Sequence, residues 1–318
     1  MFAESFKITA NAVAQIIILG AIGYFFVKKE ILGEGGLDVL SRLIVEAILP
    51  IFIFCQLIEG FRFDLYPNWW IFPLLSLAVT VAGFLLGYLF SLFIRGPHHK
   101  VQFMSLVSFQ NSGYIPIALA AALLPKEKAD VFLIYLFLFL IGFNLVIWSF
   151  GVYMLSFHER KKFEMGAMFS PPAVAALLSL AIIFFGLNRF LPETLMKPLK
   201  MVGDCTLPLA MFVVGGSLAL IRLRHIDKKA VSLIILAKLL ILPAAGLWLV
   251  VALKLPELIG LLIVMELAVP SATTLSVILR HYKKEDLLIS QGIFYSHIAG
   301  LITLPLFLSL YLALVMIK

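Results

Sequence analysis

The sequence predicts an all-α integral membrane protein with ten transmembrane helices, arranged as two inverted five-helix repeats. Of its 318 residues, 62% are hydrophobic and 14% are charged, with a mean hydropathy of +1.07. Soluble domains carry roughly 25% charged residues. Apolar segments recur along the whole chain, and motifs of the first half return in the same order in the second. The composition excludes a soluble globular enzyme and places the function within the membrane.

Each crossing of a bilayer needs about 20 apolar residues, which is too long for a strand. The ten predicted segments are 8–27, 39–58, 69–94, 101–124, 131–156, 171–188, 198–221, 230–253, 257–280 and 287–316.

Basic residues predict how these segments are oriented. The connections after the first, third, fifth, seventh and ninth segments hold 15 Lys and Arg, the opposite side holds 9, and Lys238 lies within a segment. The positive-inside rule places the richer side in the cytoplasm and both termini outside the cell membrane. The net charge of +7 therefore orients loops, and no nucleic-acid partner is expected. We expect Lys238 to snorkel toward the cytoplasm, with pairing to Glu46 or Asp204 as the alternative.

An internal repeat predicts the domain organisation. Residues 46–52 and 204–210 both place an acidic residue four positions before a proline, at an offset of 158, and Pro116 and Pro270 follow at an offset of 154. Five crossings per copy invert the second copy. Inverted repeats with interrupted helices are typical of secondary transporters.

The two repeats are predicted at 1–156 and 171–318, with a cytoplasmic connection at 157–170.

Two prolines predict helix breaks near mid-membrane. We expect the fourth segment to break from Asn111 to Pro116, because proline removes a backbone donor and clashes with the preceding turn. The ninth segment should break at Pro270. Each second half-helix then presents free N–H groups, which suit an anion such as a carboxylate. A simple proline kink is the alternative for either helix alone, but two symmetric kinks flanked by polar residues favour a site.

The candidate substrate-binding residues are Asn111, Gly113, Tyr114, Pro116, Pro270, Ser271 and Thr273.

Acidic and polar residues within the segments are candidates for ion coupling. A charge at the centre of a span costs about 2.5–3.5 kcal/mol, so Glu266 should face a cavity, a partner or an ion. It would bind sodium or exchange a proton, or else hold helices together as a hydrogen-bonded residue. Asn144 and His297 are candidates to line the same region, although such residues often serve only as interhelical contacts. Glu46 and Asp204 would form a symmetric gate or proton relay, or be partly solvated.

The candidate ion-coupling residues are thus Glu266, Asn144, Glu46, Asp204 and His297, with sodium placed at Glu266 and Asn144. We find no catalytic motif, and beyond sodium or a proton no cofactor is expected. Cys55 and Cys205 lie in apolar segments and are interpreted as packing residues.

Several motifs together resemble the auxin efflux carrier family, which includes the plant PIN-formed carriers and bacterial relatives. They are Asn111 five residues before Pro116, the pairs Leu49-Pro50 and Leu207-Pro208, and the run from Val269-Pro270-Ser271 to Arg280-His281-Tyr282. About fourteen residues join the fifth and sixth segments, as in the bacterial members.

The resemblance implies a scaffold of helices 1, 2, 6 and 7, which usually forms a homodimer, and a transport part of helices 3–5 and 8–10. The broken helices 4 and 9 would cross at their prolines, with the substrate carboxylate beside the crossing and Asn111 contacting it. The plant carriers have a glutamine where this chain has Ser271, and they lack a counterpart to Glu266. Bacterial relatives are associated with dicarboxylates such as malate and malonate.

The sequence thus predicts a carrier of a small organic anion, surrounded by membrane lipid, that works by an elevator or rocking movement. The similarly built bile acid sodium symporters have a helix 9 glutamate that serves sodium, and Glu266 and Asn144 keep that alternative open. A membrane sensor that binds its ligand without transporting it is a second alternative. An intramembrane enzyme is a third, which the absence of a recognisable nucleophile or metal cluster disfavours.

Overall fold

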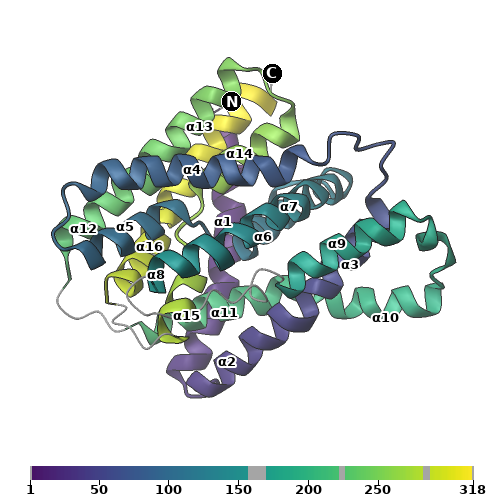
Figure 1. The fold of residues 1–318 in the computed structure, drawn as a ribbon, viewed down its shortest axis with the longest axis horizontal. Coiled ribbons are helices and arrows are strands. Elements are labelled where there is room, and N and C mark those ends of the chain that lie inside the picture. Colours follow the sequence, from purple (N-terminus) through teal and green to yellow (C-terminus); the bar gives the residue numbers. More distant parts are fainter. Residues whose placement is uncertain (1, 157–169, 222–225, 282–286, 317–318) are drawn as a thin grey trace.

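The computed structural model describes residues 2–156, 170–221, 226–281 and 287–316, and in these residues the fold is helical, with a single isolated β-bridge (Figure 1). Seven helices are long and apolar enough to cross a membrane, so the prediction of a multi-pass, all-helical protein is confirmed. The predicted connection at 157–170 lies outside the described residues except for its last residue.

The seven long helices are Phe2–Lys28 (α1), Glu34–Gly60, Ile71–Ser91 (α4), Lys126–Leu155, Glu193–Leu220, Lys228–Ala252 and Leu287–Val315. Five of them combine shorter elements: α2 (Glu34–Leu43), η1 and α3 (Leu49–Gly60); α7 (Lys126–Val146), η2 (Ile147–Gly151) and α8 (Val152–Ser156); α10 (Glu193–Asp204) and α11 (Thr206–Leu220); α12 (Lys228–Ile234), η5 and α13 (Leu242–Ala252); and α16 (Leu287–Tyr311) and η6 (Leu312–Met316).

The remaining predicted segments form shorter helices: Pro97–Ser108 (α5), Tyr114–Leu123 (α6), Pro171–Phe184 (α9), Glu257–Ala268 (α14) and Thr274–His281 (α15).

Three of the long helices are distorted just before a proline. A proline ring clashes with the carbonyl four residues earlier, and its missing N–H leaves that carbonyl unbonded. The π-helical turn η1 (Ile44–Ile48) accordingly precedes Pro50, and η5 (Ile235–Ile241) precedes Pro243. The helix α10–α11 is interrupted at Cys205, three residues before Pro208. These distortions leave each helix continuous enough to span a membrane.

Two other helices are interrupted completely. Residues 109–113 separate α5 from α6, and residues 269–273 separate α14 from α15. The first break ends before Pro116, earlier than expected. Pro116 is the third residue of α6, and a proline in the first helical turn removes an N–H that has no helical partner anyway.

The two breaks lie against each other and form what we call the crossover (residues 109–113 and 269–273). The backbone N–H of Asn111 donates to the carbonyl of Pro270 at 2.9 Å, and that of Ala272 donates to the carbonyl of Phe109 at 2.9 Å. Gln110 and Ser271 form the isolated antiparallel bridge. Each break therefore satisfies part of the backbone that the other leaves exposed, as buried irregular backbone requires.

Close packing of α1 against α11 fixes one side of the bundle. Gly215 lies so near Gly20 that a Cβ atom on Gly215 would overlap the Gly20 carbonyl group. Such contact between small residues is typical of helix pairs in membranes, where van der Waals packing drives association.

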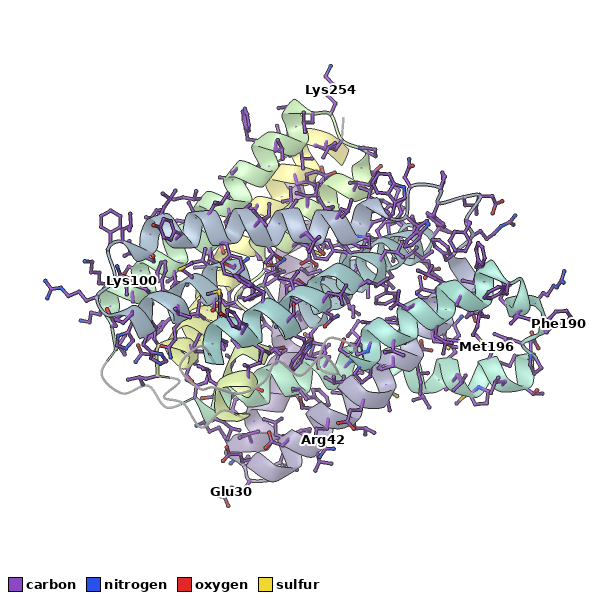
Figure 2. The ribbon with its side chains drawn as sticks, in the orientation of Figure 1. Glu30, Arg42, Lys100, Phe190, Met196 and Lys254 are labelled. Carbon is purple, nitrogen blue, oxygen red and sulfur yellow. The ribbon has the colours of Figure 1, made fainter. Side chains whose placement is uncertain are left out.

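Charged side chains mark the ends of the molecule. Figure 2 shows Lys254 at one end of the molecule and Arg42 toward the opposite end. The positive-inside rule assigns these two residues to opposite sides of the membrane, and this orientation stays a prediction.

Candidate functional site

A polar cavity of about 240 Å³ lies beside the crossover. Both breaks contribute to its wall, together with residues from η1, α7, α11 and the start of α9. Its polar lining residues are Ser41, Arg42, Glu46, Gln110, Asn111, Ser112, Tyr114, Asn144, Trp148, Ser170, Ser217, Thr273, Thr274 and Ser276.

Hydrogen-bond donors from both breaks converge on this cavity. The Asn111 side chain is 6% exposed, and its Nδ2 group has no hydrogen-bond partner among the described residues. Gly113 and Tyr114 bring the N-terminus of α6 to the wall, while Thr273 and Thr274 bring that of α15. The first N–H groups of a helix carry partial positive charge and have no i−4 carbonyl within the helix. At α15 the N–H groups of Leu275 and Ser276 donate to the carbonyls of Ala272 and Thr273, at 3.3 and 3.2 Å, so this end contributes its helix dipole more than free donors. The cavity thus combines a free amide with two helix N-termini.

A second polar cluster lies behind the crossover. Gln110 lines the cavity and also donates from Nε2 to Oε2 of Glu266 at 3.4 Å. The Ser112 hydroxyl lies near the Glu266 carboxyl group, but it has no hydrogen-bond partner among the described residues. The remaining oxygens, Oε1 of Gln110 and Oε1 of Glu266, have no hydrogen-bond partner among the described residues. Two buried acceptors of this kind can receive a proton or bind a cation.

Lys238 does not snorkel, so that prediction is wrong. Its side chain is 1% exposed, and it lies close enough to the fully buried Glu266 for the two groups to influence each other electrostatically. The π-helical stretch η5 carries Lys238 and packs against α14, which carries Glu266. An electrostatic partner within the protein therefore replaces the water that a snorkelling lysine would reach.

The other candidate substrate residues lie around the cavity in different ways. Pro116 and Pro270 are buried in the crossover region and carry no polar group toward the cavity. Ser271 is fully buried, and its hydroxyl donates to the Leu106 carbonyl at 2.7 Å. That bond joins the second break to the end of α5, so the Ser271 hydroxyl is already used within the protein.

The candidate ion-coupling residues are spread over several locations. Asn144 lines the cavity, but its Nδ2 donates to the Leu140 carbonyl at 2.9 Å, and Gln110 rather than Asn144 bonds to Glu266. Glu46 lies at the cavity in an exposed ion pair with Arg42, at 3.2 Å.

Asp204 and His297 lie elsewhere in the molecule. Asp204 is exposed near Lys200, and His297 faces a different cavity.

Sequence reasoning missed Gln110 and Arg42 as parts of this site. Gln110 was visible as one of several polar residues next to Asn111, but only the pairing of the two breaks places it against Glu266. Arg42 carries its positive charge to the cavity wall from α2. It lies one helical turn before Glu46, with which it forms an ion pair, and both side chains therefore reach the same wall.

A polar cavity at two helix breaks, inside a bundle of apolar helices, is the architecture of a membrane transporter and not of an enzyme. Residues 8–165 and 156–308 match the family described as membrane transport protein. The chain belongs to this family, that of the auxin efflux carriers, and the resemblance noted in the sequence is confirmed.

Relatives of known sequence agree with this assignment. An uncharacterized transporter from the archaeon Methanothermobacter thermautotrophicus is 26% identical over 308 residues, which cover 94% of this chain and 97% of the relative. Protein PIN-LIKES 6 of Arabidopsis thaliana is 27% identical over 120 residues, 37% of this chain and 28% of the relative. Protein PIN-LIKES 2 of the same plant is 30% identical over 111 residues, 34% of this chain and 24% of the relative. The matched region thus spans about a quarter of each plant protein.

Proposed function

We propose that this protein is a secondary carrier that moves a small organic anion across the cell membrane, with the anion bound at the crossover. The observation that carries the proposal is the convergence of the free Asn111 amide with the N-termini of α6 and α15 on one cavity. Amide and backbone donors solvate a carboxylate without binding it as tightly as a buried cationic side chain, and release is as necessary to a carrier as binding. Arg42 also reaches the cavity wall, but its charge is balanced there by its ion pair with Glu46.

Helix contacts support the ten-helix inverted repeat, with 1–156 and 171–318 as its halves. In such a repeat α1 corresponds to α9, and α3 to α10–α11. The contact between α1 and α11 then corresponds to the contact between α9 and α3. The contact between α4 and α5 corresponds in the same way to the contact between α13 and α14. The Thr206 hydroxyl meets the Ile48 carbonyl at 3.5 Å, across an offset of 158 residues that equals the offset of the sequence repeat. Two equivalent helices crossing at equivalent positions are expected at a pseudo-two-fold axis.

We assign α1–α3 and α9–α11 to a scaffold part and α4–α8 and α12–α16 to a transport part. In this assignment the transport part carries both breaks, and it moves against a homodimeric scaffold as an elevator. Both termini face outward, as the basic loops predict.

Coupling is assigned to Glu266, with Gln110 between it and the cavity. A proton on Glu266, or sodium held by the free oxygens of Gln110 and Glu266, would change the charge directly behind the anion. The exposed Glu46 and Asp204 are less suited to this role, because water screens them. Asn144 remains a contact to the cavity.

The test is transport by the purified protein in liposomes, measured as current on a solid-supported membrane. Malate, malonate, indole-3-acetate and taurocholate are offered with and without sodium and a pH gradient. Loss of one hydrogen bond to a charged ligand costs about 1.5–3 kcal/mol, so Asn111→Ala should weaken half-saturation about 10- to 100-fold while the protein still purifies as folded. Asn188→Ala, on the short helix Leu187–Phe190 away from the cavity, is the matched control.

Unchanged affinity in Asn111→Ala would remove Asn111 from the site. Sodium-dependent uptake of taurocholate alone would favour the bile-acid-type symporter. Binding of an anion without uptake would favour the sensor.

A further inference from the structure

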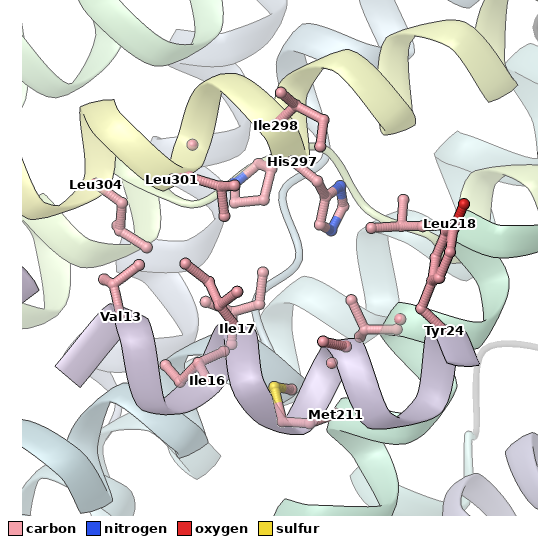
Figure 3. A pocket seen from close by; sticks show the side chains of 17 residues that line it. Val13, Ile16, Ile17, Tyr24, Met211, Leu218, His297, Ile298, Leu301 and Leu304 are labelled. Carbon is pink, nitrogen blue, oxygen red and sulfur yellow. The ribbon is translucent and has the colours of Figure 1, made fainter. Parts of the chain in front are cut away.

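A second cavity, of about 250 Å³, lies on the other side of the crossover and has a different chemistry. Its wall is formed by α1, α11 and α16 together with Ile115 and Pro270. Apart from the ring of His297 and the hydroxyl of Tyr24, the described side chains that line it are apolar (Figure 3). We call it the apolar cavity.

The flank of the molecule beside this cavity is apolar and exposed. On α1, Ile18 is 61% exposed, and on α16, Ile298 and Ile302 are 46% and 73% exposed. In a membrane-spanning chain such residues face lipid hydrocarbon. A ligand therefore reaches the apolar cavity from the bilayer.

His297 supplies one directed polar contact in this cavity. Its Nδ1 lies 2.8 Å from the carbonyl of Ile293, and because a carbonyl only accepts, Nδ1 carries the proton. In the neutral ring Nε2 is then an acceptor. The side chain is 7% exposed, Nε2 has no hydrogen-bond partner among the described residues, and the ring points into the cavity (Figure 3). An unpaired acceptor in apolar surroundings binds a ligand that donates a hydrogen bond.

We propose that the apolar cavity is a binding site for a single-chain amphiphile from the bilayer, an alkyl chain whose uncharged head donates a hydrogen bond to Nε2 of His297. Long-chain alcohols and protonated long-chain carboxylic acids share this chemistry. A phospholipid that inserts only an acyl chain does not match, because that chain ends in a methyl group, which cannot donate a hydrogen bond. The volume is below the roughly 300–1,000 Å³ of pockets that enclose a drug-sized ligand, so the cavity holds the head and the adjoining part of the chain.

Two glycines allow the cavity to be filled from opposite walls. A Cβ atom on Gly300 would meet the Pro270 ring at 3.8–3.9 Å, and one on Gly20 would meet the backbone of α11 at 3.9–4.0 Å. Both are ordinary van der Waals distances, so a Cβ atom fits at either position without pushing the helices apart, and both glycines line the cavity.

The experiment uses the full-length protein in lipid nanodiscs and hexadecanol that carries a photoreactive diazirine on its chain, with crosslinks mapped by mass spectrometry. We expect crosslinks on the cavity walls, and a labelling affinity about fivefold higher than that of the methyl ether of the same probe, because the ether cannot donate. Unlabelled palmitic acid at acidic and neutral pH then shows whether the protonated acid competes as the alcohol does. His297→Phe should make the alcohol and the ether equal.

Gly300→Leu and Gly20→Leu should each lower labelling of the cavity walls at least fivefold. Ile302→Phe, which adds bulk to the exposed face of the same helix, should leave it unchanged. Size-exclusion profiles identify any variant that fails to fold, and two variants on different helices keep the test decisive. Labelling spread evenly over exposed residues such as Ile18, or unaffected by both filled variants, would overturn the site. Equal labelling by alcohol and ether in the unmodified protein would overturn the role of His297.

Discussion

The buried charges of Lys238 and Glu266 provide a direct test of how the transport part is held together. Both side chains are at most 1% exposed, and they lie on the contacting elements η5 and α14, although no ion pair within 4.0 Å joins them among the described residues. We predict that they are charged partners. Lys238→Met removes the ammonium group and keeps most of the side-chain volume. Glu266→Gln removes the carboxylate charge and keeps its shape. Each single variant leaves one buried charge without its partner, whereas the double variant removes both.

The structure sets a limit on the interaction energy. At more than 4.0 Å and an effective dielectric constant of about 20, two unit charges attract by at most about 4 kcal/mol. Removing one member of a buried pair costs about 3–5 kcal/mol. We therefore expect each single variant to lose roughly 3–4 kcal/mol and the double variant to lie within about 1 kcal/mol of the unmodified protein. At about 2 °C per kcal/mol, the single variants should unfold roughly 6–8 °C earlier.

The assay is thermal unfolding of the four proteins in one detergent, followed by tryptophan fluorescence, with the folded fraction checked by size-exclusion chromatography. The chain has four tryptophans for this purpose. Single variants that shift by less than about 2 °C would mean that the two groups are not charged partners. A double variant that shifts by the sum of the single shifts would mean that the two charges do not interact, and the reasoning would fail.

The packing of α1 on α11 and the coupling role of Glu266 give two more predictions. Gly215→Ala should lower the free energy of unfolding by about 2–3 kcal/mol, because its Cβ would overlap the Gly20 carbonyl. Gly20→Ala makes only contacts of 3.9–4.0 Å and should be nearly neutral. Equal melting temperatures for the two variants would contradict this prediction. Glu266→Gln should abolish the sodium or pH dependence of uptake in liposomes. Glu46→Gln, which changes an exposed carboxylate, should keep that dependence. A sodium or pH dependence that survives in Glu266→Gln would place coupling elsewhere.

Hydropathy and proline chemistry are local properties of the chain. The sequence was therefore sufficient to predict where the helices lie, and to predict the breaks in the fourth and ninth segments. Each of the ten predicted apolar segments contains one or more helices among the described residues, and seven of the resulting helices are long enough to cross a membrane. The fourth segment breaks before Pro116 because a proline is tolerated in a first helical turn. The exact register of a break thus depends on which residues can begin a helix, and not on the proline alone.

The partners of buried polar residues could not be predicted in the same way. Whether Lys238 reaches water or an acid depends on which face of its helix meets α14, and periodicity is uninformative in helices that are apolar on all sides. The bond from Gln110 to Glu266 joins residues 156 positions apart. It follows from the pairing of the two breaks, which only the three-dimensional structure establishes.

The two cavities bear on how an anion would cross this protein. Pro270 lines the apolar cavity and Thr273, three residues later, lines the polar one, so the second break separates them. A carboxylate bound by Asn111 and Thr273 would find no continuous row of polar groups leading through the apolar cavity. Transport is therefore better explained by movement of the whole crossover past α1 and α11 than by passage of the anion through it.

A crosslink across the apolar cavity tests this argument. Met211 on α11 and Leu301 on α16 line the cavity from the scaffold part and the transport part (Figure 3). Cysteines are introduced at both positions in a Cys205→Ser background, which removes the exposed native thiol. A bifunctional thiol reagent that joins the two cysteines should stop uptake. Reduction of a cleavable linker should restore uptake. Tyr24→Cys with Leu218→Cys places the same linker between α1 and α11 within the scaffold part, and should leave uptake unchanged. Full uptake with Met211 and Leu301 joined would show that the two parts do not move against each other.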